Sequence, residues 1–255
     1  MTLPPILVTG GTGTLGQQVV SRLLEAGREV RVLSRRGRGS QDGPVFVIGD
    51  LATGEGLPAA VQGTGTIVHC ASNRKGDAEA TRNLVRAAAQ ATSPHLVYIS
   101  IVGVDRFPRG YYKSKLEAEG VIAGSGLPWT TLRATQFYEL IRNGAARLAK
   151  LPLIPVPAGF VVQPVDSGEP RGRVADMAGP QVLSFADLIR TYLTAAGRRP
   201  RPVVSVWTPG IGPIRAGALY PQPGAGATLG RRSWPDFLAG KPADQPAAKP
   251  DEAAG

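Results

Sequence analysis

The chain has 255 residues, the length of one large domain or of one domain with a small appendage, and its 42% hydrophobic content is that of a globular protein. Its single Cys excludes an internal disulfide framework, and one Cys with two His argues against a zinc site built from these residue types. The 29 Lys and Arg residues against 19 Asp and Glu residues give a net charge of +10, which points either to an anionic partner or to solubility alone.

Targeting and membrane signals are missing from the sequence as given. Residues 1–5 contain no basic leader, and the longest apolar stretch, 151–162, is interrupted by three prolines and is too short to span a bilayer. We therefore expect a cytoplasmic protein without a membrane partner.

The first 135 residues alternate between strand-like and helix-like segments. Most of the strand-like segments are continuously apolar, which is typical of strands covered on both faces. We predict an α/β fold with a doubly wound parallel sheet, the Rossmann fold, and we expect Asp77 to be an N-cap. The predicted order is strand 6–9, helix 17–26, strands 29–33, 45–49 and 66–70, helix 77–91, strand 95–100, helix 111–123 and strand 129–133.

The remainder of the chain is less regular. We predict a dinucleotide-binding core over 1–135, a small irregular region over 136–240 that caps a substrate, and a disordered tail over 241–255. Within the middle region, 184–196 is a predicted helix that Ser184 caps and Gly197 ends.

A glycine-rich turn, TGGTGTLG at 9–16, joins the first predicted strand to the first predicted helix. In this position Gly10 permits a tight turn, Gly13 lets the backbone approach a pyrophosphate, and Gly16 packs the helix against the strand. The free N–H groups and the positive end of the helix dipole favour the pyrophosphate, so this context disfavours a simple structural turn. The predicted cofactor contacts of the turn are Gly10, Thr12, Gly13, Thr14, Leu15 and Gly16.

The end of the second predicted strand indicates which dinucleotide is bound. NAD-binding folds commonly carry an acidic residue there for the ribose hydroxyls, but this chain reads LSRR at 33–36 and has no acid before Asp42. The guanidinium groups of Arg35 and Arg36 can pair with a 2′-phosphate and stack on adenine. We therefore expect NADP(H) to be preferred over NAD(H); a solvated arginine-rich loop that continues to Arg38 is the alternative.

Asp50 and Leu51 follow the third predicted strand. At that place Asp50 would lie at the edge of the adenine and accept a hydrogen bond from its exocyclic amine. A structural role for Asp50 as a helix N-cap is the alternative.

Several segments resemble a known family. They are the glycine turn, Asp50-Leu51, HCAS at 69–72, YYKSK at 111–115 and LPWTTLRATQF at 127–137. Together they are similar to the short-chain dehydrogenase/reductase superfamily, and the last of them narrows the resemblance to its atypical extended, NmrA-like branch of NAD(P)-binding proteins. The resemblance spans roughly residues 5–240, is specific for fold and cofactor and weak for substrate, and adds Ala71 to the cofactor contacts.

The resemblance implies a catalytic Ser–Tyr–Lys site made of Ser100, Tyr111 and Lys115. Tyr111 would exchange a proton with a carbonyl or alcohol oxygen while a hydride moves to or from the nicotinamide. Tyr111 and Lys115 are four residues apart and so lie on one helix face, where we expect the Lys115 cation to lower the pKa of Tyr111. The resemblance implies that Lys115 also holds the nicotinamide ribose. Ser100 matches the family's substrate-orienting serine. An ordinary amphipathic helix that carries the Tyr–Lys spacing by chance is the alternative.

Other polar residues of these segments have less specific predictions. We expect His69 and His95 to be core or strand-end residues rather than bases, and Cys70 to be a small buried hydrophobe. Asn83 resembles the family's helix asparagine that fixes a water relay, with an exposed polar residue as the alternative. No metal is expected.

One segment departs from the family pattern. After QPVD at 163–166 the family continues through a valine-arginine-aspartate turn into a helix, whereas here Asp166 is followed directly by SGEPRGR at 167–173. One helix near 166–167 is therefore predicted to be missing, which affects the shape of the substrate pocket and the stability of the region around it.

Three functions follow from these predictions. The first is an NADP(H)-binding oxidoreductase that reduces a small carbonyl or quinone-like compound. The second is a non-catalytic NmrA-like dinucleotide sensor, and the third is a nucleoside-diphosphate-sugar epimerase or dehydratase, which Arg35 and Arg36 disfavour. Direct nucleic-acid binding is not expected, because no segment shows a basic stripe with interleaved aromatic residues. We expect a monomer or homodimer with a small-molecule substrate whose identity the sequence does not give.

Overall fold

The computed structural model describes residues 3–37, 43–72, 76–107, 109–162, 175–222 and 226–240. The described residues divide into two compact units, one made of residues up to 133 and the other of residues 134–162, 175–222 and 226–240. The helix predicted to be missing near 166–167 and the tail predicted to be disordered over 241–255 lie outside the described residues. Among the helices that are described, each falls short of the length and apolarity that a bilayer crossing demands.

A parallel sheet is the centre of the first unit, and its hydrogen-bonded order is β3-β2-β1-β4-β5-β6. This order reverses direction between β1 and β4, as in a doubly wound sheet, and confirms the predicted Rossmann fold. Two short strands, β9 (Met177–Ala178) and β12 (Thr228–Leu229), extend the sheet beyond β6 to eight strands. The first six strands are β1 (Ile6–Thr9), β2 (Val30–Ser34), β3 (Val45–Ile48), β4 (Thr66–His69), β5 (His95–Ile101) and β6 (Trp129–Ala134).

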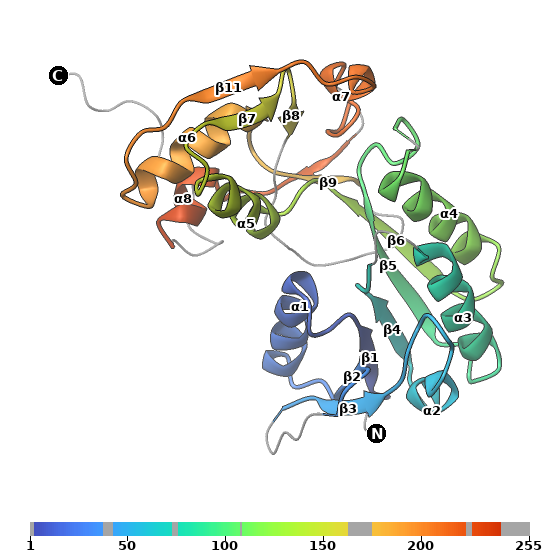
Figure 1. The fold of residues 1–255 in the computed structure, drawn as a ribbon. Helices are drawn as coiled ribbons and strands as arrows, with labels where there is room; N and C mark the ends of the chain where they lie inside the picture. Colours follow the sequence, from blue (N-terminus) through green and yellow to red (C-terminus); the bar gives the residue numbers. More distant parts are fainter. Residues whose placement is uncertain are drawn as a thin grey trace. The chain divides into compact units, whose positions relative to one another are not determined.

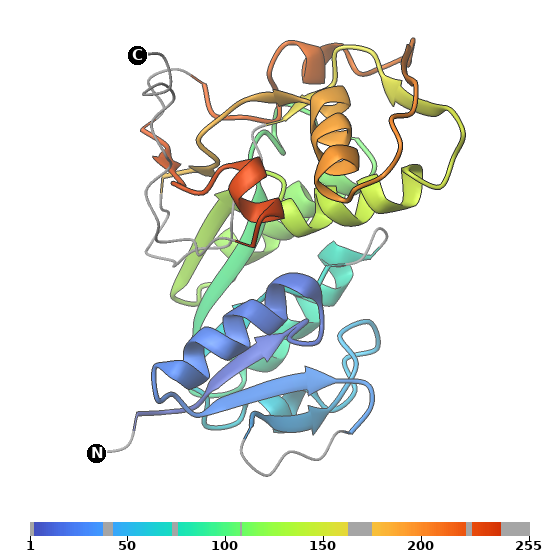
Figure 2. The same cartoon turned by 90° about the vertical axis from the view of Figure 1, so that its left-hand side faces the viewer.

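Helices cover this sheet on both faces because alternate residues of each strand point to opposite sides. Leu96 and Tyr98 of β5 pack in one apolar cluster with residues of α2, α3 and α4, whereas Val97 packs in another with Val20 of α1. In Figure 1, α1 lies on one side of the strands and α3 and α4 lie on the other, and in Figure 2 α1 (blue) lies in front of the first strands. The helices are α1 (Thr14–Glu25), α2 (Leu57–Val61), α3 (Asp77–Ala89) and α4 (Tyr111–Ala123).

The predicted N-cap role of Asp77 is wrong. Gly76, with φ 91°, is the N-cap of α3, and Asp77 is the first residue of the helix. Glycine suits the cap because a positive φ costs it no Cβ clash. The Asp77 side chain is 5% exposed and turns toward a buried lysine instead of capping the helix, which makes it part of the site described below.

The second unit consists of short strands packed against helices. Its two long helices are α5 (Tyr138–Leu148) and α6 (Phe185–Ala195). Ser184 caps α6, as predicted, because its side chain accepts a hydrogen bond from the Asp187 backbone N–H. The proline-rich stretch contains a strand that the sequence did not predict, β7, and within the described part of the chain it forms a two-stranded parallel sheet with β11. Edge positions of this kind tolerate the prolines of β7. The remaining elements are β7 (Ile154–Pro157), β8 (Val161–Val162), β10 (Leu183–Ser184), β11 (Val203–Val206), α7 (Gly212–Arg215) and α8 (Trp234–Leu238).

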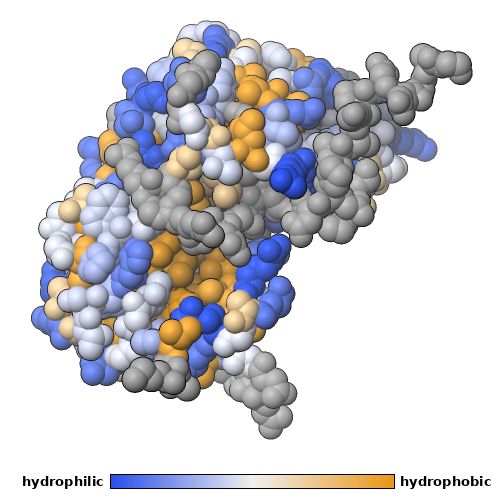
Figure 3. Space-filling model, turned by 180° about the vertical axis from the view of Figure 1, so that it is seen from behind, coloured by the Kyte–Doolittle hydropathy of each residue, from blue (hydrophilic) through white to orange (hydrophobic). Residues whose placement is uncertain are grey.

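Aromatic packing stabilises the core of this second unit. Tyr138 stacks on Phe237, and Trp234 is 1% exposed and donates its indole N–H to the Leu188 carbonyl. By contrast, Trp207 is 76% exposed. Figure 3, the view from behind, shows hydrophilic residues, in blue, at many places on this face and a patch of hydrophobic residues, in orange, gathered in its lower half.

Candidate active site

The glycine turn connects β1 to α1, at the edge of the sheet where the parallel strands end. Gly10 has φ 71°, and a Cβ there would lie 2.6 Å from the Ala71 backbone, so Gly10 allows the ends of β1 and β4 to come together. At Gly16 a Cβ would collide with the carbonyl oxygen of Gly10. Gly13 is the N-cap of α1 and provides no capping side chain, which leaves N–H groups of the first helical turn to a ligand. The turn therefore has the close packing and the open helix end that a pyrophosphate site requires.

The two arginines predicted to bind the cofactor follow β2. Arg35 and Arg36 are both exposed, and the Arg36 backbone N–H donates to the Ser34 hydroxyl. Their guanidinium groups therefore lie at the surface just beyond the carboxyl end of β2, the place at which such folds hold the adenosine ribose.

The segment after β3 is held by side chains. Asp50 accepts a hydrogen bond of 2.8 Å from the Ala52 backbone N–H, which makes it the first residue of a turn rather than the N-cap of α2. Asn83 donates to the carbonyl oxygens of Leu51 and Ala52 at 3.0 and 3.1 Å. Asn83 is therefore not the exposed polar residue that the sequence allowed, because it is half-buried and its amide ties this turn to α3.

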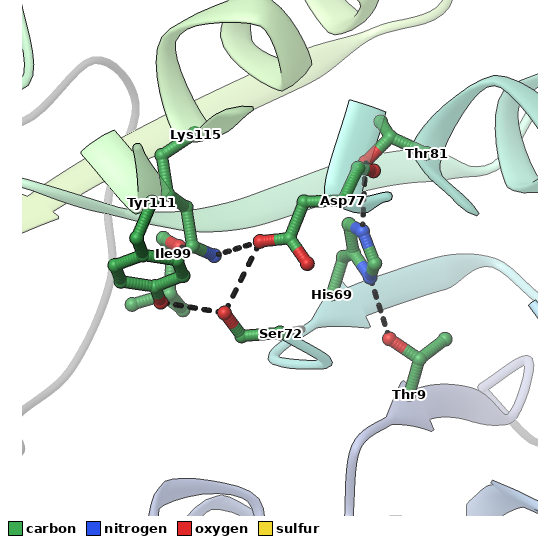
Figure 4. Close-up of polar contacts among 8 residues, drawn as sticks. All are labelled: Thr9, His69, Ser72, Asp77, Thr81, Ile99, Tyr111 and Lys115. Carbon is green, nitrogen blue, oxygen red and sulfur yellow. Dashed lines mark hydrogen bonds and ion pairs between the residues drawn. The ribbon is translucent and has the colours of Figure 1, made fainter. Parts of the chain in front are cut away.

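A polar cluster gathers where β4 and β5 end and α3 and α4 begin (Figure 4). Tyr111 and Lys115 lie in the first turns of α4 and point the same way, as the four-residue spacing predicts. The Tyr111 hydroxyl lies 2.5 Å from Ser72 Oγ, and Ser72 Oγ donates to Asp77 Oδ2 at 3.1 Å. Lys115 Nζ lies 3.5 Å from the same Asp77 oxygen and donates to the Ile99 carbonyl at 3.2 Å. The fold thus brings a phenol, a hydroxyl, a carboxylate and an ammonium group into one hydrogen-bonded cluster.

The electrostatics of this cluster differ from the prediction. Lys115 is 3% exposed, and burial lowers its pKa although the Asp77 carboxylate acts in the opposite direction. Burial also raises the pKa of Tyr111, the Ser72 hydrogen bond lowers it, and the Asp77 and Tyr112 charges raise it further. The prediction that Lys115 lowers the pKa of Tyr111 is therefore wrong, because the pKa is raised. Asp77 neutralises Lys115, whose Nζ lies 6.0 Å from the Tyr111 ring centre.

Ser100, the predicted third catalytic residue, does not reach this hydrogen-bonded chain. It is 2% exposed, and its hydroxyl has no hydrogen-bond partner among the described residues. The hydroxyl that contacts Tyr111 is that of Ser72, which follows β4. The sequence contained both missed residues, Ser72 in the HCAS segment and Asp77 at the helix start, but their spacing along the chain gave no sign that they meet Tyr111.

His69 is a core residue, as predicted. It is 2% exposed and stacks on Tyr98, and burial and the Lys115 charge lower the pKa of His69 to about 3. Thr81 gives its hydroxyl proton to the Asp77 carbonyl, so His69 Nε2 must be the donor to Thr81, and Nδ1 accepts from Thr9. His69 is therefore a neutral structural link and not a base.

The other predicted residues of this region have structural surroundings. His95 begins β5, is exposed, and lies 2.9 Å from the Thr130 hydroxyl. Cys70 is partly buried against the α1 side of the sheet, and burial raises the pKa of its thiol to about 12. Within the described ranges, no group of three or more His, Cys, Asp or Glu residues is placed to hold a metal ion.

Known proteins resemble this chain in its dinucleotide-binding part. The NAD(P)H-binding family matches residues 10–150, more than half of the chain. The chain belongs to this family. Together with its relatives and structural neighbours, the match confirms the resemblance to the extended, NmrA-like short-chain dehydrogenases/reductases.

Curated relatives of this NAD(P)H-binding chain match it over different lengths. A photosystem II assembly factor, Ycf39 of Trieres chinensis, is 31% identical over 52% of this chain and 46% of its own length. An uncharacterized protein of Mycobacterium tuberculosis is 28% identical over 90% of this chain and 28% of its own length. The chain therefore spans less than half the length of these two relatives.

Solved structures share the fold of this NAD(P)H-binding chain. The NADPH-dependent quinone oxidoreductase QOR2 of Escherichia coli, complexed with NADPH, superposes with a TM-score of 0.71 at 19% identity and covers 93% of this chain and 95% of its own. A UDP-glucose 4-epimerase of Thermotoga maritima superposes with a TM-score of 0.65 at 17% identity and covers 81% and 87%. At these identities the likeness shows the fold alone.

The buried neutral His69 predicts acid sensitivity. Its pKa of about 3 in the folded chain lies below the ordinary histidine value of 6.5, so its contribution to stability is present above pH 6.5 and is lost as the pH falls toward 3. Between pH 7 and pH 4 we expect this residue alone to remove about 3 kcal/mol from the free energy of unfolding. Urea denaturation at several pH values measures the loss.

His69→Asn removes the titrating group and should flatten the dependence of stability on pH, whereas His95→Gln at the exposed histidine should leave it as in the wild type. An equally steep dependence in His69→Asn would show that His69 is not the group responsible.

Proposed function

We propose that this chain is an NADP(H)-dependent oxidoreductase that reduces a small carbonyl or quinone-like compound by hydride transfer. The observation that carries the proposal is the link from the Tyr111 hydroxyl, through Ser72, to the buried Lys115–Asp77 pair beyond β4 and β5. In doubly wound sheets, ligands bind outside the carboxyl ends of the strands, and here the glycine turn after β1 opens at the same edge.

The residues of the first unit fit a dinucleotide. Gly10 and Gly16 stand where a Cβ would meet backbone, Gly13 leaves the start of α1 uncapped, and Arg35 and Arg36 are exposed beyond β2. We assign the pyrophosphate to the turn and a 2′-phosphate to the two arginines, which gives the preference for NADP(H). When bound, the dinucleotide supplies the hydride.

The chain's own residues provide the proton. Tyr111 donates its hydroxyl proton to the substrate oxygen as the hydride arrives at the adjacent carbon, and the product is an alcohol. Its ring is half-buried and its hydroxyl lies beside the exposed Ser72, so a substrate can approach it. We assign Lys115 to the ribose of the nicotinamide as well as to Asp77.

Two relatives support a reductase. The structural neighbour QOR2 is an NADPH-dependent quinone oxidoreductase. A (4-alkanoyl-5-oxo-2,5-dihydrofuran-3-yl)methyl phosphate reductase of Streptomyces griseus is 34% identical over 52% of this chain and 48% of its own length.

A non-catalytic dinucleotide sensor is the second candidate. The observation that favours it is the engagement of Lys115, which is buried against Asp77 and donates to the Ile99 carbonyl, so two of the three N–H donors of its ammonium group are already used within the chain. The sensor predicts NADP(H) binding without turnover of any carbonyl or quinone.

Calorimetry with NADPH and NADH tests the cofactor assignment. We expect wild type to bind NADPH more tightly, and Arg35→Ala with Arg36→Ala to weaken NADPH binding by about tenfold or more while NADH binding stays unchanged, because a charge-assisted pair to a phosphate contributes about 1.5–3 kcal/mol. The matched control is Arg198→Ala with Arg199→Ala in the second unit. Failure of the wild type to bind either nucleotide would refute the proposal.

Replacement of Tyr111 tests the chemistry. In a screen of carbonyl and quinone compounds followed by NADPH oxidation, Tyr111→Phe should retain NADPH binding and lose about a hundredfold or more in kcat, since it lacks the proton that general acid catalysis needs. Tyr112→Phe, which removes the neighbouring hydroxyl, is the control. Unchanged turnover in Tyr111→Phe would remove Tyr111 from the mechanism.

A further inference from the structure

The direction of each hydrogen bond around Tyr111 can be assigned from the number of protons available. Ser72 has one hydroxyl proton and gives it to Asp77, since an ionised carboxylate can only accept. In the 2.5 Å contact between Ser72 and Tyr111, Ser72 must then accept and Tyr111 must donate. The arrangement therefore holds the phenol of Tyr111 in its protonated form, with its proton directed at Ser72.

Several contacts hold Asp77 in place, so it is a fixed acceptor at the end of the Tyr111–Ser72–Asp77 hydrogen bonds. Its carboxylate lies beside Lys115 Nζ and at the first residue of α3, where the helix dipole favours a negative charge. Its carbonyl oxygen accepts the Thr81 hydroxyl at 2.7 Å, and Thr81 lies 3.2 Å from His69. His69 in turn accepts from Thr9, the last residue of β1 before the glycine turn (Figure 4).

Ser72, and not Ser100, is the serine whose hydroxyl contacts Tyr111. The two serines follow different strands, and the Ser100 hydroxyl is buried without a partner among the described residues while Ser72 is exposed at the side of Tyr111. Exposure matters because the hydroxyl beside Tyr111 must be free to turn when the proton leaves.

We propose that Ser72 and Asp77 are positioning residues for Tyr111. Before the reaction, Asp77 orients the Ser72 hydroxyl so that Tyr111 is a proton donor. Once Tyr111 has given up its proton, Ser72 turns its hydroxyl from Asp77 to the phenolate oxygen. This role rests on the proposed reductase function. In the step itself the Tyr111 O–H bond breaks, an O–H bond forms on the substrate oxygen, and the hydride from NADPH reduces the carbonyl carbon. The phenolate then regains a proton from water.

The charged and titratable groups around Tyr111 come from three elements and one loop. Of the described residues, Asp77 faces it from α3, Tyr112 and Lys115 from α4, Tyr98 from β5, and Ser72 from the loop after β4. Further from Tyr111, Cys70 and Glu119 act on the Lys115 charge. The Asp77 charge disfavours the phenolate, whereas a hydrogen bond from Ser72 favours it, so the two residues have opposite effects on the pKa of Tyr111.

This opposition gives a test that needs neither cofactor nor substrate. The six tyrosines are replaced by 3-fluorotyrosine, which brings the phenol titration to lower pH, and the ¹⁹F signal of Tyr111 is assigned with Tyr111→Phe. We expect its apparent pKa to rise in Ser72→Ala, to fall in Asp77→Asn, and to stay near the wild-type value in Ser72→Thr, which restores the hydroxyl. The matched exposed controls, Ser21→Ala and Asp187→Asn, should leave it unchanged.

Kinetics provide the second readout. Ser72→Ala should lower kcat by about tenfold or more with KM for NADPH unchanged, and Ser72→Thr should recover most of the loss. The role of Ser72 is overturned if the Tyr111 signal does not rise in Ser72→Ala, and that of Asp77 if the signal does not fall in folded Asp77→Asn. Should Asp77→Asn fail to fold, Ser72→Ala against Ser72→Thr decides the matter.

Failure of the reductase function has a different signature. Wild type that does not bind NADPH, with both titration shifts present, refutes the proposed function and leaves the hydrogen-bonded arrangement standing. Normal NADPH turnover without the shifts refutes the positioning role alone.

Discussion

The buried ion pair between Lys115 and Asp77 is the interaction on which the rest of the site depends. Its side chains are 4% and 5% exposed, and removing two charges from water to this extent is costly unless they meet each other. Because Lys115 comes from α4 and Asp77 from α3, the pair holds the start of one helix against the start of the other. Ser72 contacts Asp77 from the exposed side of the pair, and Tyr111 contacts Ser72. One electrostatic requirement thus sets the packing of α3 on α4 and also the position of the phenol.

The same pair changes what the tyrosine can do. A lone lysine beside Tyr111 would favour the phenolate, but Asp77 neutralises the lysine and, with burial, keeps the phenol protonated. A resting proton donor suits reduction of a carbonyl, whereas a resting phenolate suits oxidation of an alcohol. A series of buried hydrogen bonds through Thr9, His69 and Thr81 connects the end of β1, before the glycine turn, to Asp77. The predicted cofactor site and the proton donor therefore belong to one hydrogen-bonded network.

The sequence predicted the fold because its signals are local. Apolar strands alternating with helices, and a glycine turn between β1 and α1, are enough for a doubly wound sheet, and the four-residue spacing of Tyr111 and Lys115 is enough to place both on one face of α4. The errors concern contacts between segments distant in sequence. Asp77 was predicted to be a cap, and the contact of Ser72 with Tyr111 was not predicted, because nothing in the spacing of residues shows which strand end meets which helix. Strand β7 was missed for a related reason, since its proline-rich sequence becomes a strand only through pairing with β11.

A double-mutant cycle on the pair tests this account most directly. The free energy of unfolding is measured for wild type, Lys115→Met, Asp77→Asn and the double variant. Each single variant leaves one buried charged group without its partner and should lose about 3–5 kcal/mol, while the double variant should lose no more than either single one. Additive losses, with the double variant destabilised by the sum of the two, would show that Lys115 and Asp77 act independently and would contradict the account.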